Sequence, residues 1–173
     1  MADQNNDGLD ETDRLKQDIA REFEEAFANV SYPGDDKIVD NPDYYENDKI
    51  FEAFRGKHWK EINLEMLFWH RQSLHRLSPE GFRFFFPCFM VGALLHSEET
   101  DTLWQSMFYD LTPPASEGPR MDWFLNVVNL LDARQKAAVR RYVELYVQIE
   151  TSLPDPSKER ALSFWRRITE PEA

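Results

Sequence analysis

The sequence is organised around residues 77–95, which read LSPEGFRFFFPCFMVGALL. From Phe82 to Leu95 the only charged residue is Arg83. A helix that is apolar on every side is a buried one, and this run is too short and too interrupted to cross a membrane. The stretch therefore predicts a buried central helix, kinked where Pro87 removes a backbone hydrogen bond.

Local signals mark where this helix begins. Ser78 can accept hydrogen bonds from the first free amides, and Pro79 fits the next position, where no amide donor is needed. Glu80 lies in the first turn, where the helix dipole favours a negative charge. Similar signals predict caps at Asn63 and Ser97, and a capping box formed by Asp132 and Gln135.

Apolar residues at helical spacing predict the other elements. The expected helices cover about residues 13–30, 44–55, 63–76, 97–111, 120–131 and 132–149, with a last helix from 155. The helix at 120–131 is apolar nearly all round, which predicts a second buried element. No alternating strand pattern occurs. The sequence thus predicts an all-α, irregular single-domain bundle of seven to eight helices over residues 13–170, after a flexible acidic tail at 1–12.

The net charge of −12 is concentrated in the first 50 residues, which hold 15 acidic and 5 basic side chains. Nucleic-acid binding is not expected, because phosphate contacts need a basic surface. A cationic partner is the physical complement of such a region, and a solvated acidic face that aids solubility is the alternative. No signal peptide or membrane span is visible, and Cys88 is the single cysteine, so we expect a cytoplasmic protein without disulfides.

A search for chemistry finds no set of residues that specifies a reaction. His70 and His75 are five residues apart and do not share a helix face, so we expect no metal site and no cofactor. Cys88 lies in an apolar run, where a thiol is inert, although a pair with His58 or His75 stays open. No glycine-rich phosphate loop or nucleophile elbow is present. The sequence favours a protein that is not an enzyme.

Three blocks of residues resemble a known family. They are Gly56-Lys57-His58-Trp59, then Leu77-Ser78-Pro79-Glu80-Gly81-Phe82 followed by Phe84-Phe85-Phe86-Pro87-Cys88-Phe89, and Leu131-Asp132-Ala133-Arg134-Gln135 with Ala138 and Val139. They are similar to blocks of an uncharacterised family of small bacterial all-helical proteins that carries a domain-of-unknown-function label. The resemblance spans about residues 50–145. It implies a bacterial source and a helical fold, and it brings no catalytic residues.

These observations lead to a hypothesis of a non-enzymatic protein-binding module, of the immunity or antitoxin-like kind, that inhibits a basic partner protein. Aromatic anchors and steering carboxylates would form the binding residues: Asp35, Asp36, Asp40, Tyr44, Tyr45 and Trp69. Trp69 falls on the face of its helix opposite Leu64 and Leu67, so that helix either packs on both faces, which we favour, or presents an aromatic patch. The alternative function is an enzyme or small-ligand receptor with a pocket beside the central helix. The protein is expected to be a monomer or a weak homodimer formed through Trp69 or the last helix.

Overall fold

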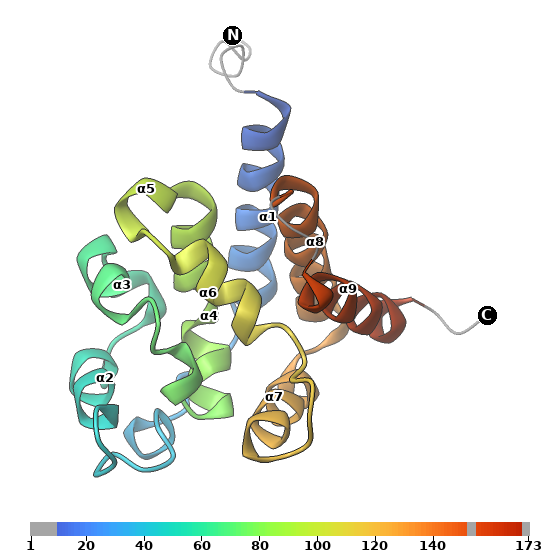
Figure 1. Cartoon of the computed structure of the whole chain (residues 1–173). Helices are drawn as coiled ribbons and strands as arrows, with labels where there is room; N and C mark the ends of the chain where they lie inside the picture. The colour runs from blue at the N-terminus through green and yellow to red at the C-terminus, as the bar shows by residue number, and fades with distance from the viewer. Residues whose placement is uncertain (1–9, 152–154, 171–173) are drawn as a thin grey trace, which may run out of the picture.

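The computed structural model describes residues 10–151 and 155–170, and within these ranges every regular element is helical (Figure 1). The α-helices are α1 (Glu11–Phe27), α2 (Asn47–Phe54), α3 (Leu64–His70), α4 (Pro79–Leu95), α5 (Ser97–Thr100), α6 (Leu103–Asp110), α7 (Pro119–Leu130), α8 (Ala133–Ile149) and α9 (Pro156–Thr169). Three short 3-10 helices lie between them: η1 (Asp35–Lys37), η2 (Trp59–Glu61) and η3 (Leu74–Arg76). The prediction of an all-α bundle is confirmed.

Helix α4 forms the interior of this bundle, as predicted. Ser78 caps it by accepting a hydrogen bond from the Gly81 amide at 2.9 Å, and Pro79 is its first residue. The side chains of Phe84, Phe86 and Cys88 are all buried. Helices α1, α6 and α7 pack against α4 (Figure 1), so the central helix serves as a scaffold that the other helices enclose.

Aromatic rings fill the contact between α1 and α4. The rings of Phe23 and Phe27 meet the Phe86 ring edge to face, with centroids 5.2 and 5.5 Å apart. Such pairs add specific geometry to the area that they bury. The high phenylalanine content of the sequence is therefore used in the core rather than on a binding face.

Helices α8 and α9 close the bundle on the side of α1. The predicted capping box at the start of α8 is present, with the Gln135 amide donating to Asp132 at 2.8 Å. Helix α9 packs on α8, and its buried Trp165 donates from Nε1 to the Leu111 carbonyl at 2.7 Å. The last helix is thus fixed to the loop that follows α6.

Two predicted helices are interrupted. The helix expected at 63–76 begins at its predicted Asn63 cap, but α3 ends at His70 and η3 follows, because Leu74 and Leu77 turn into the core. The helix expected at 97–111 divides into α5 and α6 at Asp101, whose φ of 54° is incompatible with a continuous right-handed helix. The division also explains why the described residues hold more helices than the seven to eight expected.

The N-terminal start of the domain and the burial of helix α7 also differ from expectation. Helix α1 begins at Glu11, because the Asp10 carboxylate accepts a hydrogen bond from the Asp13 amide at 2.8 Å, so part of the predicted tail at 1–12 is helical. Residues 1–9 of that tail lie outside the described residues.

Helix α7 buries one face only, and its Leu125 side chain is 41% exposed. None of the described helices is long and apolar enough to cross a bilayer.

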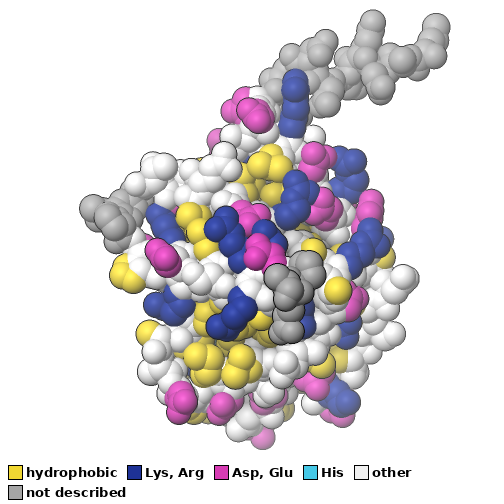
Figure 2. Space-filling model, turned by 90° about the vertical axis from the view of Figure 1, so that its right-hand side faces the viewer, with side chains coloured by type: hydrophobic (Ala, Val, Ile, Leu, Met, Phe, Trp, Pro, Cys, Tyr) yellow, Lys and Arg dark blue, Asp and Glu magenta, His cyan; other side chains and the backbone are white. Residues whose placement is uncertain are grey.

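Charges of both signs are interspersed on the face that carries α8 and α9, which is the right-hand side of Figure 1 and faces the reader in Figure 2. Arginines of α8 account for part of this mixture. Arg134 pairs with Glu25 of α1 at 2.7 Å, and Arg141 pairs with Glu22 of the same helix. Some of the acidity in the first third of the sequence therefore fastens α1 to α8 and is not free to attract a partner.

Candidate functional site

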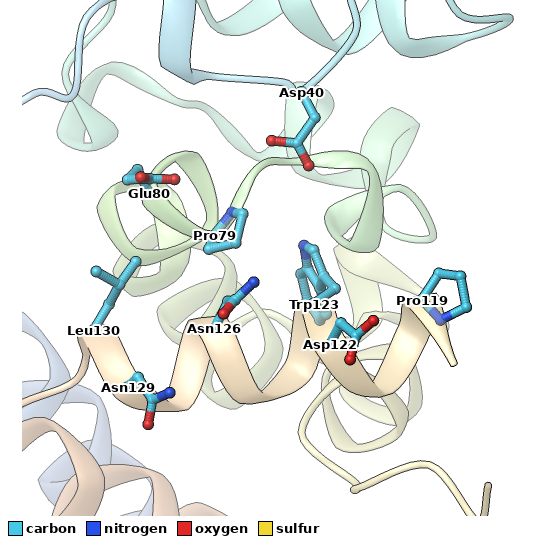
Figure 3. Close-up of a pocket in the computed structure, with 9 residues that line it drawn as sticks. All are labelled: Asp40, Pro79, Glu80, Pro119, Asp122, Trp123, Asn126, Asn129 and Leu130. Atoms are coloured by element: carbon cyan, nitrogen blue, oxygen red, sulfur yellow. The ribbon is translucent and has the colours of Figure 1, made fainter. Parts of the chain in front are cut away.

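An acidic groove lies between α7 and the start of α4 (Figure 3). It has a volume of about 590 Å³ and combines three carboxylates with amide and apolar side chains. The lining residues are Asp40, Pro79, Glu80, Pro119, Asp122, Trp123, Asn126, Asn129 and Leu130. Figure 3 shows Trp123 and Asn126 pointing from α7 toward Pro79 and Asp40 on the opposite wall.

The wall that carries Asp40 is held in place by the start of α4. The Ser78 amide donates to the Ile38 carbonyl at 2.9 Å, and the Ser78 hydroxyl donates to the Lys37 carbonyl. A Cβ atom on Gly81 would lie 2.3 Å from the Ile38 oxygen, so only glycine allows this close approach. The same residues that cap α4 thus position Asp40 at the groove.

The opposite wall is a face of α7. Trp123 donates from Nε1 to the Leu77 carbonyl at 2.8 Å, and its ring meets Phe82 edge to face at 5.2 Å. Asp122, Asn126 and Asn129 recur at intervals of four and three residues, which brings them to neighbouring positions along one side of a helix. The tryptophan therefore fixes α7 on α4 while polar side chains border the groove.

The groove has an unbalanced negative charge. Burial raises the pKa of Asp40, and the neighbouring Glu80 carboxylate raises it further by repulsion. Asp40, Glu80 and Asp122 form no ion pair with any described residue, in contrast to Glu22 and Glu25 on α1. A ligand that brings positive charge and hydrogen-bond donors would relieve this repulsion.

The structure brings one of the six predicted binding residues, Asp40, into the groove. Tyr44 and Tyr45, which are 62% and 77% exposed, follow in the segment between η1 and α2. Asp36 is also exposed, whereas Asp35 accepts a hydrogen bond from the Tyr32 hydroxyl and so has a structural partner. These residues stay candidates for partner contact.

Trp69 is 69% exposed, so the favoured expectation that α3 packs on both faces is wrong and the helix presents this ring to solvent. The tertiary contacts decide which face of α3 is exposed, because α4 and α5 cover the other side of this helix. Figure 1 shows α3 and α7 on opposite sides of α4. Trp69 is therefore not part of the acidic groove.

The residues considered for catalysis are not brought together. Cys88 is buried, its thiol donates to the Phe85 carbonyl at 3.0 Å, and burial raises its pKa well above the ordinary value. The His58 ring nitrogen accepts from the Lys60 amide and caps η2. His75 lies beside Asp110, with 4.0 Å between Nδ1 and Oδ1. Neither histidine lines the cavity next to Cys88, so the structure forms no thiol–histidine pair with them.

Sequence reasoning missed the contribution of α7 to the groove. Asp122, Asn126 and Asn129 interrupt the helix that the sequence predicts to be apolar nearly all round. Their regular spacing was the available signal, because a polar stripe on an apolar helix marks the face that the core leaves uncovered. No cluster of three metal-ligating side chains occurs among the residues that the structure describes.

Together, fold and groove define an all-helical protein with an acidic surface groove between its central helix and α7. The model of a family described as "Family of unknown function (DUF6714)" matches residues 13–169, so the chain belongs to that family. This confirms the resemblance to an uncharacterised helical family, while the bacterial source stays an expectation. No curated protein and no solved structure matches the chain.

Proposed function

We propose that this protein is a non-enzymatic binding module whose acidic groove receives a basic segment of a partner protein. The observation that carries the proposal is the set of three carboxylates, Asp40, Glu80 and Asp122, that surround one groove without a cationic partner among the described residues. Lysine and arginine side chains would supply the missing charge, and arginine would also offer several donors to the carboxylate and amide oxygens.

The exposed tyrosines give the proposal a second support. Tyr44 and Tyr45 are a few residues from Asp40 in sequence, and aromatic side chains dominate the energetics of many interfaces. A basic segment in the groove could extend over this neighbouring surface. An inhibitor of the immunity or antitoxin kind would use such an arrangement, since an acidic surface that covers a basic one speeds encounter and blocks access. The proposal takes the cytoplasm as the compartment.

The test compares which basic proteins are retained by immobilised wild type, by a groove variant and by a matched control at low ionic strength. The groove variant is Asp40→Asn with Asp122→Asn. The control, Glu11→Gln with Glu98→Gln, changes the net charge equally at exposed positions away from the groove. We expect the wild type and the control to retain the same basic protein, and the groove variant to lose it.

The ionic strength provides a further criterion. Contacts between exposed charges weaken strongly as salt rises toward about 0.5 M, where the screening length is only a few ångströms. The retained protein should therefore be released by salt. A basic protein that binds the groove variant as well as the wild type, or no difference between the three columns, would overturn the proposal.

A further inference from the structure

A second cavity, independent of the acidic groove, lies beside the central helix. It has a volume of about 430 Å³ and is formed by α1, the η2–α3 segment and α4. Its walls are largely apolar, with Ile62, Leu64 and Leu67 on one side and Cys88 and Val91 of α4 on the other. The lining also includes Asn63, His96 and Trp59, whose buried Nε1 has no hydrogen-bond partner among the described residues. We call it the Cys88 cavity. Its size falls in the range of sites for small molecules.

The rim of the Cys88 cavity carries one charge of each sign. Glu24 comes from α1 and Lys60 from η2, and both side chains are exposed. They do not pair with each other, and neither forms an ion pair with another described residue. Lys60 lies over the Trp59 ring, with Nζ 5.2 Å from the centroid, which is a contact that holds the ammonium group at this edge.

From this combination we propose that the Cys88 cavity binds a free hydrophobic α-amino acid. The carboxylate of the ligand would pair with Lys60, its ammonium group with Glu24, and its apolar side chain would enter between Leu67 and Val91. A purely apolar ligand would leave both rim charges unused, and a simple anion or cation would leave one of them unpaired. A zwitterion with an apolar body complements the two rim charges and the apolar wall residues together.

The protein already excludes an alternative use of this cavity. The Cys88 thiol has a hydrogen-bond acceptor in the Phe85 carbonyl, and His96, which also lines the cavity, is eight residues further along the chain, directly after the end of α4. That separation corresponds to about 12 Å along a helix, too far for a histidine to activate the thiol. The Cys88 thiol therefore has no activating histidine within this cavity.

The test titrates L-leucine and L-phenylalanine into the full-length protein and follows the methyl resonances of Leu64, Leu67 and Val91 by NMR. Two further probes remove one charge each: 4-methylpentanoate lacks the ammonium group, and 3-methylbutylamine lacks the carboxylate. We expect both amino acids to shift these resonances, and each charge-deleted probe to bind about three- to fivefold more weakly, as expected for the loss of one exposed ion pair.

Variants assign the rim contacts. Lys60→Gln and Glu24→Gln should each weaken L-leucine binding about three- to fivefold, whereas the controls Lys57→Gln and Glu98→Gln, which make the same changes of charge outside the cavity, should not. Val91→Trp fills the cavity and should abolish binding while the circular dichroism spectrum stays that of a folded helical protein. Cavity methyl resonances that do not respond to either amino acid, or charge-deleted probes that bind as tightly as L-leucine, would overturn the proposal.

Discussion

At the scale of single residues, Asp110 is the carboxylate that the fold buries most fully among the described residues, with 7% of its side chain exposed. It ends α6, and its nearest ionisable neighbours are Arg120 of α7 at 3.5 Å and His75 of η3 at 4.0 Å. Burial raises the pKa of Asp110 to about 7, although the Arg120 guanidinium acts in the opposite direction. The pKa of His75 is lowered by its own burial and by Arg120 and Arg76.

The raised pKa of Asp110 predicts that stability falls with rising pH between about 4 and 7. In this window the folded protein keeps a proton that the unfolded chain has lost, so its free energy of unfolding decreases by at most about 1.4 kcal/mol per pH unit. His75 opposes the trend, because its lowered pKa favours the folded state as pH rises through about 6.5. Asp110→Asn should remove the Asp110 contribution and be more stable than wild type at pH 8. Urea unfolding at several pH values measures this, with Glu98→Gln as control, and an unchanged pH profile would contradict it.

Gly81 supports a second prediction at this scale. Alanine in place of a helical glycine ordinarily stabilises a protein by up to about 1 kcal/mol. Here the added methyl group would meet the Ile38 carbonyl, so Gly81→Ala should instead destabilise by about 1–3 kcal/mol and displace the segment that carries Asp40. Thermal or urea unfolding decides the sign, and Gln105→Ala, at an exposed position of α6, is the control. A stabilised Gly81→Ala protein would show that the segment moves freely.

At the scale of the helix, two tryptophans have opposite roles. Trp165 of α9 is 1% exposed and bonded to the Leu111 carbonyl, whereas Trp69 of α3 faces solvent. Trp165→Ala should cost about 3–5 kcal/mol, because it leaves a cavity and an unpaired carbonyl. Trp69→Ala should change the free energy of unfolding by no more than about 0.5 kcal/mol. Urea unfolding of both variants tests the pair, and a large loss with Trp69→Ala would show that its ring is covered.

The helices also show how far the sequence predicts this fold. The sequence predicts the caps at Asn63, Ser78 and Asp132, because a cap depends on residues within one turn of each other. The positive φ of Asp101 between α5 and α6 could not be predicted, because no glycine marks this position in the sequence. For the acidic groove, Asp40 was found from charge alone. Its partner residues on α7 belong to another element, and only the tertiary arrangement brings them opposite Asp40.

At the scale of the whole molecule, the net charge of −12 acts on folding and on binding in different ways. Like charges repel within the folded protein, and added salt screens that repulsion. The ion pairs between α1 and α8, such as Arg134 with Glu25, are on the surface, where a pair contributes about 1 kcal/mol or less. Their loss at high salt is therefore offset by the weaker self-repulsion.

It follows that salt should have opposite effects on folding and on association. Between about 0.02 M and 0.5 M salt the free energy of unfolding should stay level or rise, while association of a basic protein with the acidic groove should weaken strongly. Urea unfolding and binding measured in the same buffers provide the comparison, with Glu11→Gln/Glu98→Gln as the control variant that should keep both the association and its salt dependence. Salt that promotes unfolding and dissociation to a similar degree would contradict this prediction. The ion pairs would then be essential to the fold. The salt sensitivity of binding would reflect partial unfolding instead of contacts in the groove.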